Sequence, residues 1–257
     1  MTAAADLHRI QSYLRVAAPR WREHAQIGPF LATFSDDTDN PYVNYAIPDD
    51  DAKPSEADIA ALVEAYREHK RKPRLEYIPS VAPAVEPALV AYGFEIEYRT
   101  PLMTYRGSPP TSVAPPEIEL LAPVTEKDFR GAATVQWEAY EEQGPLTQQA
   151  VDSLRRTVDA GGIVVFARDA STEEPAGAGL CTAPHDATTE LATVGVRKTF
   201  RRRGIAAAMT HWLTQQALER GIDNVFLMAE GEAEERIYAR VGFEMVSEVL
   251  HISFVHA

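Results

Sequence analysis

The stretch Arg201-Arg202-Arg203-Gly204-Ile205-Ala206 separates a predicted strand from a predicted helix. Residues 190–196 before it are apolar and β-branched without helical spacing, which predicts a strand. After it, apolar residues recur every four positions from Ile205 to Ala217, which predicts a helix with one apolar face. The first N–H groups of a helix have no internal partner and carry a partial positive charge. With a glycine at its entrance, this helix predicts a site where an anion such as a diphosphate approaches the backbone.

Other anion-binding motifs do not fit this turn. A P-loop requires a Gly-Lys-Ser/Thr ending, which does not follow Gly204, and the G-x-G-x-x-G fingerprint of dinucleotide-binding proteins is absent as well. On its own, the basic run 197–203 is also typical of a nucleic-acid patch or of a solvated face. The strand–turn–helix context favours a fixed anion site, because such a site needs this geometry.

The turn resembles the acyl-CoA loop of the GNAT superfamily of N-acetyltransferases, which reads Arg/Gln-x-x-Gly-x-Gly/Ala after a strand. Arg201, Gly204 and Ala206 fill its three fixed positions. A second match is the family's Tyr-x-x-x-Gly-Phe before a closing strand, found here at residues 238–243. The resemblance covers about residues 117–255 and departs at Gly231, where many members have an asparagine that contacts the cofactor arm.

The resemblance implies a mixed α/β (α+β) fold with the element order β-α-α-β-β-β-α-β-α-β, and acetyl-CoA as co-substrate. Residues 194–196 would pair with the amides of the pantetheine arm as an added β-strand does. The implied acetyl-CoA site comprises Val194, Gly195, Val196, Arg201, Arg202, Arg203, Gly204, Ile205, Ala206 and Ala207.

Two further residues are candidates for catalysis. Tyr238 matches tyrosines that give a proton to the departing sulfur in this family; the alternative is a packed aromatic whose hydroxyl is satisfied elsewhere. Glu190 stands eleven residues before Arg201, where some members carry their general base; the alternative is an exposed strand carboxylate. The backbone N–H of Val196 would stabilise the oxyanion. The histidines show no metal-ligand spacing, so no metal is expected.

Composition and charge limit the protein class. The chain has 257 residues, 45% of them hydrophobic, and a single cysteine, Cys181, which excludes an intrachain disulfide framework and fits a reducing cytoplasm. It has neither a spanning apolar segment nor a secretory leader, so we expect a cytoplasmic protein without a membrane partner. The net charge of −13 argues against a nucleic-acid partner. Five of the 13 basic residues in 117–257 fall within 197–203, which favours a phosphate-rich ligand.

The chain is predicted to contain two domains, 1–106 and 117–257, joined by a proline-rich linker at 107–116. Residues 91–96 resemble 240–245 at an offset of 149, which suggests a tandem pair. The first member would be a degenerate GNAT-like domain that binds no CoA. Its loop before a predicted helix carries three consecutive carboxylates at 49–51, which would repel a diphosphate, and Leu89 stands where Tyr238 stands in the second.

The predicted function is the acetyl-CoA-dependent N-acetylation of a primary amine on a small cationic molecule. Aromatic and acidic residues end the predicted acceptor-side helix, and such a mixture suits a cation; they are Trp137, Glu138, Tyr140, Glu141 and Glu142. A solvated acidic helix end is the alternative for this group. A protein or peptide acceptor, or a non-catalytic acyl-CoA-binding module, are the alternatives for the function. The oligomeric state stays open between monomer and homodimer.

Overall fold

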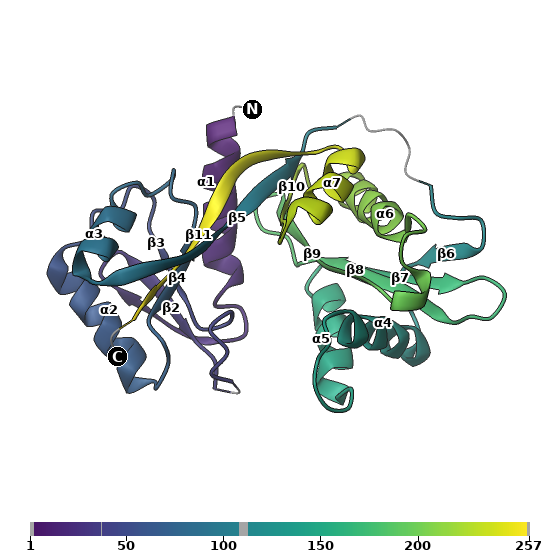
Figure 1. The fold of residues 1–257 in the computed structure, drawn as a ribbon, viewed down its shortest axis with the longest axis horizontal. Coiled ribbons are helices and arrows are strands. Elements are labelled where there is room, and N and C mark those ends of the chain that lie inside the picture. Colours follow the sequence, from purple (N-terminus) through teal and green to yellow (C-terminus); the bar gives the residue numbers. More distant parts are fainter. Residues whose placement is uncertain (1–2, 37, 108–112, 256–257) are drawn as a thin grey trace. The chain divides into compact units, whose positions relative to one another are not determined.

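The computed structural model describes residues 3–36, 38–107 and 113–255, which form two compact units (Figure 1). The first unit is Met1–Leu102 with Val246–Ala257, and the second is Met103–Met245. The structure thus groups the end of the last strand with the first unit, whereas the sequence placed it in the second domain. The predicted linker lies partly outside the described residues, and the domain limits at 106 and 117 stay a prediction.

The second unit has the predicted element order. It runs β6 (Ile118–Leu121), α4 (Glu126–Ala139), α5 (Gln148–Asp159), β7 (Ile163–Asp169), β8 (Pro175–Cys181), β9 (Thr188–Val196), a 3₁₀ turn (Lys198–Phe200), α6 (Ile205–Glu219), β10 (Asn224–Met228), α7 (Glu232–Val241) and the start of β11 (Phe243–Phe254). Its strand order is β10-β9-β8-β7-β6. Strands β10 and β9 are parallel, whereas the other neighbours in this set are antiparallel.

The sequence predicts Thr125, with Asp128, and Thr147 as helix caps, and both caps are present at the starts of α4 and α5. Thr125 and Asp128 form a reciprocal capping box at α4, and the Thr147 hydroxyl accepts a hydrogen bond from the Ala150 N–H at α5. The sequence predicts a helix over residues 125–142, whereas α4 ends at Ala139, because Glu141 adopts a positive φ of 54°.

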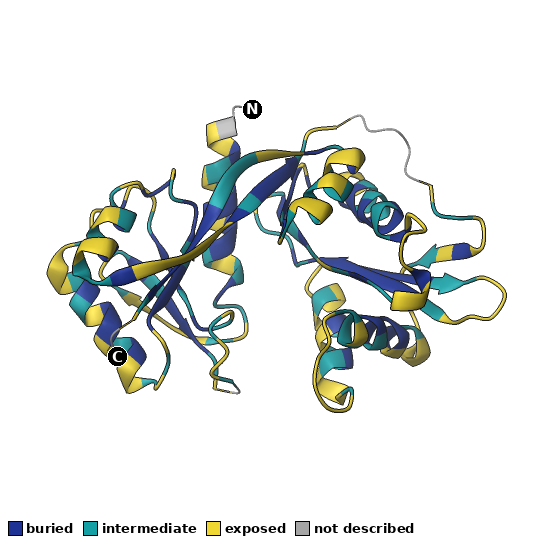
Figure 2. Ribbon diagram, viewed as in Figure 1, coloured by how far each residue is buried: buried dark blue, intermediate teal, exposed yellow. Residues whose placement is uncertain are grey.

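Two layers of helix enclose this part of the sheet, with α6 on one face and α4 and α5 on the other (Figure 1). The α6 face is a core of buried apolar side chains that includes Ile205, Met209 and Leu213. The opposite core includes Phe129 from α4 and Leu154 from α5. Strands β7 and β8 are almost wholly buried between these layers (Figure 2), so the sheet is a rigid support for β9.

The first unit contains elements that the sequence predicted only in part. It runs α1 (Ala3–Ala17), β1 (Glu23–Ile27), β2 (Phe30–Phe34), β3 (Ala46–Pro48), α2 (Glu56–Glu68), β4 (Arg74–Tyr77), α3 (Val85–Tyr92) and β5 (Phe94–Tyr105), with most of β11. Its strand order is β1-β2-β3-β4-β11-β5. The sequence predicts a helix over residues 59–66 and a strand over residues 75–78, which α2 and β4 match. Helix α1 and strands β1–β3 were not predicted.

Helix α3 with strand β5, and helix α7 with strand β11, follow the same pattern. Helices α3 and α7 each end at a glycine in the left-handed region, Gly93 with φ 113° and Gly242 with φ 105°. Each glycine is followed by a phenylalanine that opens a strand of 12 residues. The match at an offset of 149 therefore corresponds to the same helix–turn–strand element in both units.

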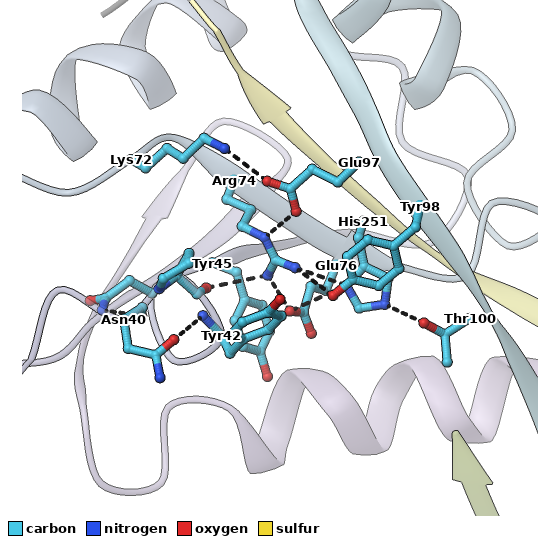
Figure 3. A network of polar contacts seen from close by, with 12 residues as sticks. Asn40, Tyr42, Tyr45, Lys72, Arg74, Glu76, Glu97, Tyr98, Thr100 and His251 are labelled. Carbon is cyan, nitrogen blue, oxygen red and sulfur yellow. Dashed lines mark hydrogen bonds and ion pairs between the residues drawn. The ribbon is translucent and has the colours of Figure 1, made fainter. Parts of the chain in front are cut away.

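A buried charge lies in the core of the first unit (Figure 3). The Arg74 side chain is 0% exposed, and its Nε donates to Glu97 Oε2 at 2.8 Å. Its Nη1 contacts Glu76 Oε1 and donates to the Pro41 carbonyl at 3.2 Å. The Tyr42 ring covers the guanidinium, with 4.9 Å from Cζ to the ring centroid. The charge is therefore compensated by two carboxylates and an aromatic face.

The same network ties strand β11 to strands β4 and β5. Arg74 Nη2 lies 2.9 Å from His251 Nδ1 on β11, and His251 Nε2 lies 3.0 Å from the Thr100 hydroxyl on β5. The Tyr98 ring stacks on the imidazole, with 4.2 Å between centroids (Figure 3). The end of β11 is thus fixed in the first unit by side chains as well as by its register with β4.

Candidate active site

The basic turn forms a concave backbone in front of α6. Arg202 has a φ of 64°, and Gly204, the N-cap of α6, has a φ of 79°. Left-handed residues at such spacing turn successive N–H groups into an anion-binding nest. A Cβ on Gly204 would meet no heavy atom of the described chain within 4 Å, so the helix start is open. The helical ladder begins with Ala208 N donating to Gly204 O at 3.0 Å, which leaves the preceding N–H groups available to a ligand.

Side chains of the basic run hold the turn in place. Arg201 Nε donates to the Val196 carbonyl at 3.0 Å. Arg203 Nη2 donates to the Thr199 carbonyl at 3.2 Å, and its guanidinium lies 5.2 Å from the Phe200 ring centroid. The basic residues 201–203 therefore form a turn held by side-chain hydrogen bonds.

Arg197 has a structural role that the sequence did not reveal. Its Nε and Nη2 contact the two oxygens of Glu138 at 2.6 and 3.0 Å, and its Nη1 contacts Glu174 at 3.0 Å. Hydrogen bonding and attraction from Glu138 raise the pKa of Arg197 despite its partial burial. This bidentate pair fastens the end of β9 to the end of α4.

The end of β9 leaves one edge without its parallel neighbour. Its register with β10 comprises three pairs, from Thr188 with Asn224 to Glu190 with Phe226. On the other edge β9 pairs with β8 as far as Val196, with an irregularity at Thr193, where φ is 52°. Residues 194–196 therefore lie beyond the register with β10, as an added strand of ligand amides requires.

Gly195 allows α4 to approach this strand end. A Cβ at Gly195 would lie 2.7 Å from Ala139 Cβ and 3.9 Å from Tyr140 Cε2. Any side chain at this position would displace α4. The structure thereby brings Tyr140, the C-cap of α4, to the strand that the sequence assigns to the cofactor arm.

Tyr238 lies on α7, half-buried, and its ring packs 6.3 Å from the ring of Phe243. Burial raises the pKa of the Tyr238 phenol, and Tyr140, Glu234 and Glu230 raise it further. Burial and the same two carboxylates raise the pKa of Tyr140 to about 12. Both phenols therefore hold their protons at neutral pH, which is the state that a proton donor requires.

Glu234 and Glu230 are site residues that the sequence analysis missed. Glu234 precedes Tyr238 by four residues, so both lie on one face of α7. Burial raises the pKa of Glu234, and the nearby Glu230 adds to this effect. The four-residue spacing between Glu234 and Tyr238 on a predicted helix could have indicated Glu234 from the sequence.

Glu190 lies on the part of β9 that pairs with β10, opposite Phe226. Its backbone is held by Thr182, whose hydroxyl accepts from the Glu190 N–H at 3.1 Å. Val194 is four positions further along, about 13 Å in an extended strand. Its role as a base stays a prediction.

Two further searches cover only the residues that the structure describes. No group of three or more His, Cys, Asp or Glu side chains there could hold a metal ion. No helix in this part of the chain is long and apolar enough to cross a membrane.

The model of the acetyltransferase (GNAT) family matches residues 128–243, so this part of the chain is a GNAT acetyltransferase domain. Solved structures extend the likeness to the whole chain. A GCN5-related N-acetyltransferase from Kribbella flavida has a TM-score of 0.80 at 24% identity, covering 98% of this chain and 96% of its own. One from Sphaerobacter thermophilus has a TM-score of 0.63 at 16% identity, with 98% and 93% covered.

A tandem GNAT protein from the clavulanic acid biosynthesis pathway has a TM-score of 0.64 at 14% identity, covering 87% of this chain and 77% of its own. No curated protein matches the sequence. The comparisons confirm the predicted family and the mixed α/β GNAT fold. That the first unit is a degenerate copy stays a prediction.

Proposed function

We propose that the second unit transfers the acetyl group of acetyl-CoA to a primary amine. The open start of α6 carries this proposal, because an uncapped helix N-terminus with three arginines beside it suits a diphosphate. The edge of residues 194–196 would pair with the amides of the pantetheine arm. Family membership supports the acetyl donor.

The reaction needs a neutral amine, a stabilised oxyanion and a protonated leaving group. The amine nitrogen attacks the thioester carbon, the C–S bond breaks, and the thiolate takes the proton of Tyr238. The excess proton on the attacking nitrogen then returns to the Tyr238 phenolate, which leaves a neutral amide. Glu190 would take the ammonium proton, through a water, and the Val196 N–H would face the oxyanion. The placement of Tyr238 beside Tyr140 and Glu234 supports its role as the proton donor.

We expect Tyr238→Phe to lower kcat about a hundredfold, because the thiolate would leave without a proton. Free thiol release across a panel of amines measures kcat, and calorimetry should give an unchanged Kd for acetyl-CoA. Tyr105→Phe is the matched control, since Tyr105 packs on the same Phe243 ring at 5.6 Å. Equal losses in both variants would contradict the proton-donor role. Absence of amine-dependent thiol release in the wild type would favour the non-catalytic binding module.

The acceptor is proposed to be a small cationic amine. Ion pairs within the chain favour other carboxylates for this cation than those the sequence suggested. Glu138 is paired with Arg197, and Glu141 lies 3.1 Å from Lys198 Nζ, so both already have cationic partners. Glu230 and Glu234 lie close enough to the tyrosines to raise their pKa values. We therefore place the acceptor cation beside Glu230 and Glu234, with a peptide acceptor as the alternative.

Glu234→Gln is expected to raise the KM of a cationic acceptor about tenfold, the loss of one charge-assisted contact. Glu232→Gln is the control, because Glu232 shares the first turn of α7 but is exposed and pairs with Arg236 at 2.9 Å. The wild-type KM should rise with salt as the Debye length shrinks from ~10 Å at 0.1 M to ~3 Å at 1 M. A screen of polyamines, aminoglycosides, amino acids and peptides tests the class. An anionic or peptide best acceptor, or a KM that falls with salt, would refute the cationic small molecule.

A cytoplasmic location is proposed from the state of Cys181. Burial raises the pKa of its thiol to about 12, so it is an unreactive thiol in the core and not a disulfide partner. The acidic net charge supports the proposal that neither nucleic acid nor membrane is a partner. The choice between monomer and homodimer remains open to a sedimentation measurement.

A further inference from the structure

The side chain of Gln11 bridges two strands in the first unit. Gln11 lies on α1 and is 0% exposed. Its Nε2 donates to the carbonyl of Pro48 at the end of β3, at 3.1 Å. Its Oε1 accepts from the N–H of Ile78, directly after β4, at 3.2 Å. One carboxamide therefore satisfies a backbone acceptor and a backbone donor on neighbouring strands.

Those two strands occupy the place that β9 and β10 occupy in the second unit. In both units a strand, a turn, a helix and a parallel strand follow one another. The register of β3 with β4 comprises the single pair of Ala46 with Leu75. Beyond this pair the two strands are not in register with each other. In the second unit, the corresponding opening is where we place the amides of the acyl-CoA arm. A glutamine side chain carries the same amide donor and acceptor.

The helix start in the first unit is closed as well. At α2, Ser55 and Asp58 form a reciprocal capping box, and hydrogen bonding to Ser55 lowers the pKa of Asp58. The N-terminus of α2 thus already holds a carboxylate, whereas that of α6 is open at Gly204. A Cβ on Gly28 would lie 2.4 Å from Asp58 Oδ1, so the neighbouring hairpin also closes against this helix start.

Helix α1 also binds the acidic loop between β3 and α2. Arg15 contacts Asp49 at 2.6 Å and donates from Nη1 to the Ile47 carbonyl at 2.6 Å. About two helical turns before Arg15, His8 contacts Asp50 at 2.6 Å. Two of the three carboxylates that would repel a diphosphate, Asp49 and Asp50, are therefore paired with side chains of α1.

We propose that the first unit holds an intrachain ligand, in which the Gln11 amide of α1 takes the position of the arm of an acyl-CoA and the Asp58 carboxylate of α2 takes that of its phosphate. The first unit is then folded without cofactor. Where the proposed function of the second unit holds, the chain binds one acetyl-CoA.

Backbone hydrogen exchange of the full chain, with and without acetyl-CoA, tests this. Gln11→Ala should speed exchange of the Ile78 amide about tenfold, because its acceptor is lost. Ser12→Ala, an exposed neighbour on α1, should leave that amide unchanged. If Gln11→Ala does not fold, Gln11→Met keeps the volume and removes the same bonds. Unchanged exchange at Ile78 in a folded Gln11 variant would overturn the bridging role.

Acetyl-CoA separates this inference from the proposed function. It should slow exchange over residues 194–207 in every variant and leave residues 46–58 and Ile78 unaffected. Slower exchange over 46–58, or two molecules bound per chain by calorimetry, would overturn the intrachain ligand. Loss of the effect over 194–207 alone would contradict the proposed function and leave the first unit's assignment standing.

Discussion

Replacing Gly204 by glutamate is expected to weaken acetyl-CoA binding about a thousandfold. The new carboxylate would stand at the open start of α6, where a Cβ meets no heavy atom of the described chain within 4 Å. Two like charges about 4 Å apart near a protein surface repel by about 4 kcal/mol, which corresponds to a factor of about a thousand in Kd. The side chain would also block approach to the backbone N–H groups that bind the diphosphate. Calorimetric titration with acetyl-CoA measures the loss.

The same helix offers a matched control at its other end. Gly221 follows the C-cap of α6, has a φ of 78° against 79° for Gly204, and is equally open to an added Cβ among the described residues. Glutamate at either position costs about 1–2 kcal/mol of backbone strain and adds one negative charge. Gly221→Glu should therefore share the loss of stability and keep wild-type affinity. Wild-type affinity in Gly204→Glu, or equal loss in both variants, would refute the acyl-CoA assignment.

The features that could be predicted from the sequence are those that local residues determine. The turn before α6 needs only a strand end, a glycine and an apolar repeat, all within about 30 residues. The caps Thr125 and Thr147 act within three residues of themselves, and the structure has both. Tyr238 became a candidate because residues 238–243 match the family's Tyr-x-x-x-Gly-Phe motif, and its role stays a prediction.

The features that the sequence did not reveal depend on partners far along the chain. The pairing of Arg197 with Glu138 joins residues 59 positions apart, so neither residue signals it alone. The same is true of Gln11, whose partners lie 37 and 67 positions away. The end of β11 belongs to the first unit through its register with β4, which lies far away in the sequence. Long-range side-chain pairs and strand pairings are tertiary outcomes that local propensity does not encode.

Arg74→Met is expected to lower the free energy of unfolding by about 3–5 kcal/mol, the cost of leaving buried charges without their partner. Glu76 and Glu97 would lose the guanidinium that lies between them, and His251 its donor. Methionine fills a similar volume, so the loss would report charge and not a cavity. Urea unfolding followed by circular dichroism measures it. The triple variant that adds Glu76→Gln and Glu97→Gln should recover much of the stability, because no buried charge remains unpaired.

Acid provides a second readout of the same network. Burial alone would raise the pKa of Glu97, but hydrogen bonds from Lys72, Arg74 and Ser253 outweigh it and hold the pKa at about 2, below the ordinary 4.5. Ionised Glu97 therefore stabilises the fold above pH 4.5, and this contribution is lost as the pH falls from 4.5 to about 2. In Arg74→Met the pKa of Glu97 would rise toward 4.5, so this acid-dependent loss should be smaller and should be complete at a higher pH.

Lys72 is the control that separates burial from charge pairing. Its Nζ lies 2.8 Å from Glu97 Oε1, the same distance as Arg74 Nε from Glu97 Oε2, but its side chain is 48% exposed whereas that of Arg74 is 0% exposed. Water replaces a lost partner at an exposed site, so Lys72→Met should cost less than about 1 kcal/mol. If the two variants lost equal stability, the ion pair itself and not its burial would determine the cost. The network would then be a peripheral contact, and the attachment of β11 to the first unit would rest on its backbone register with β4.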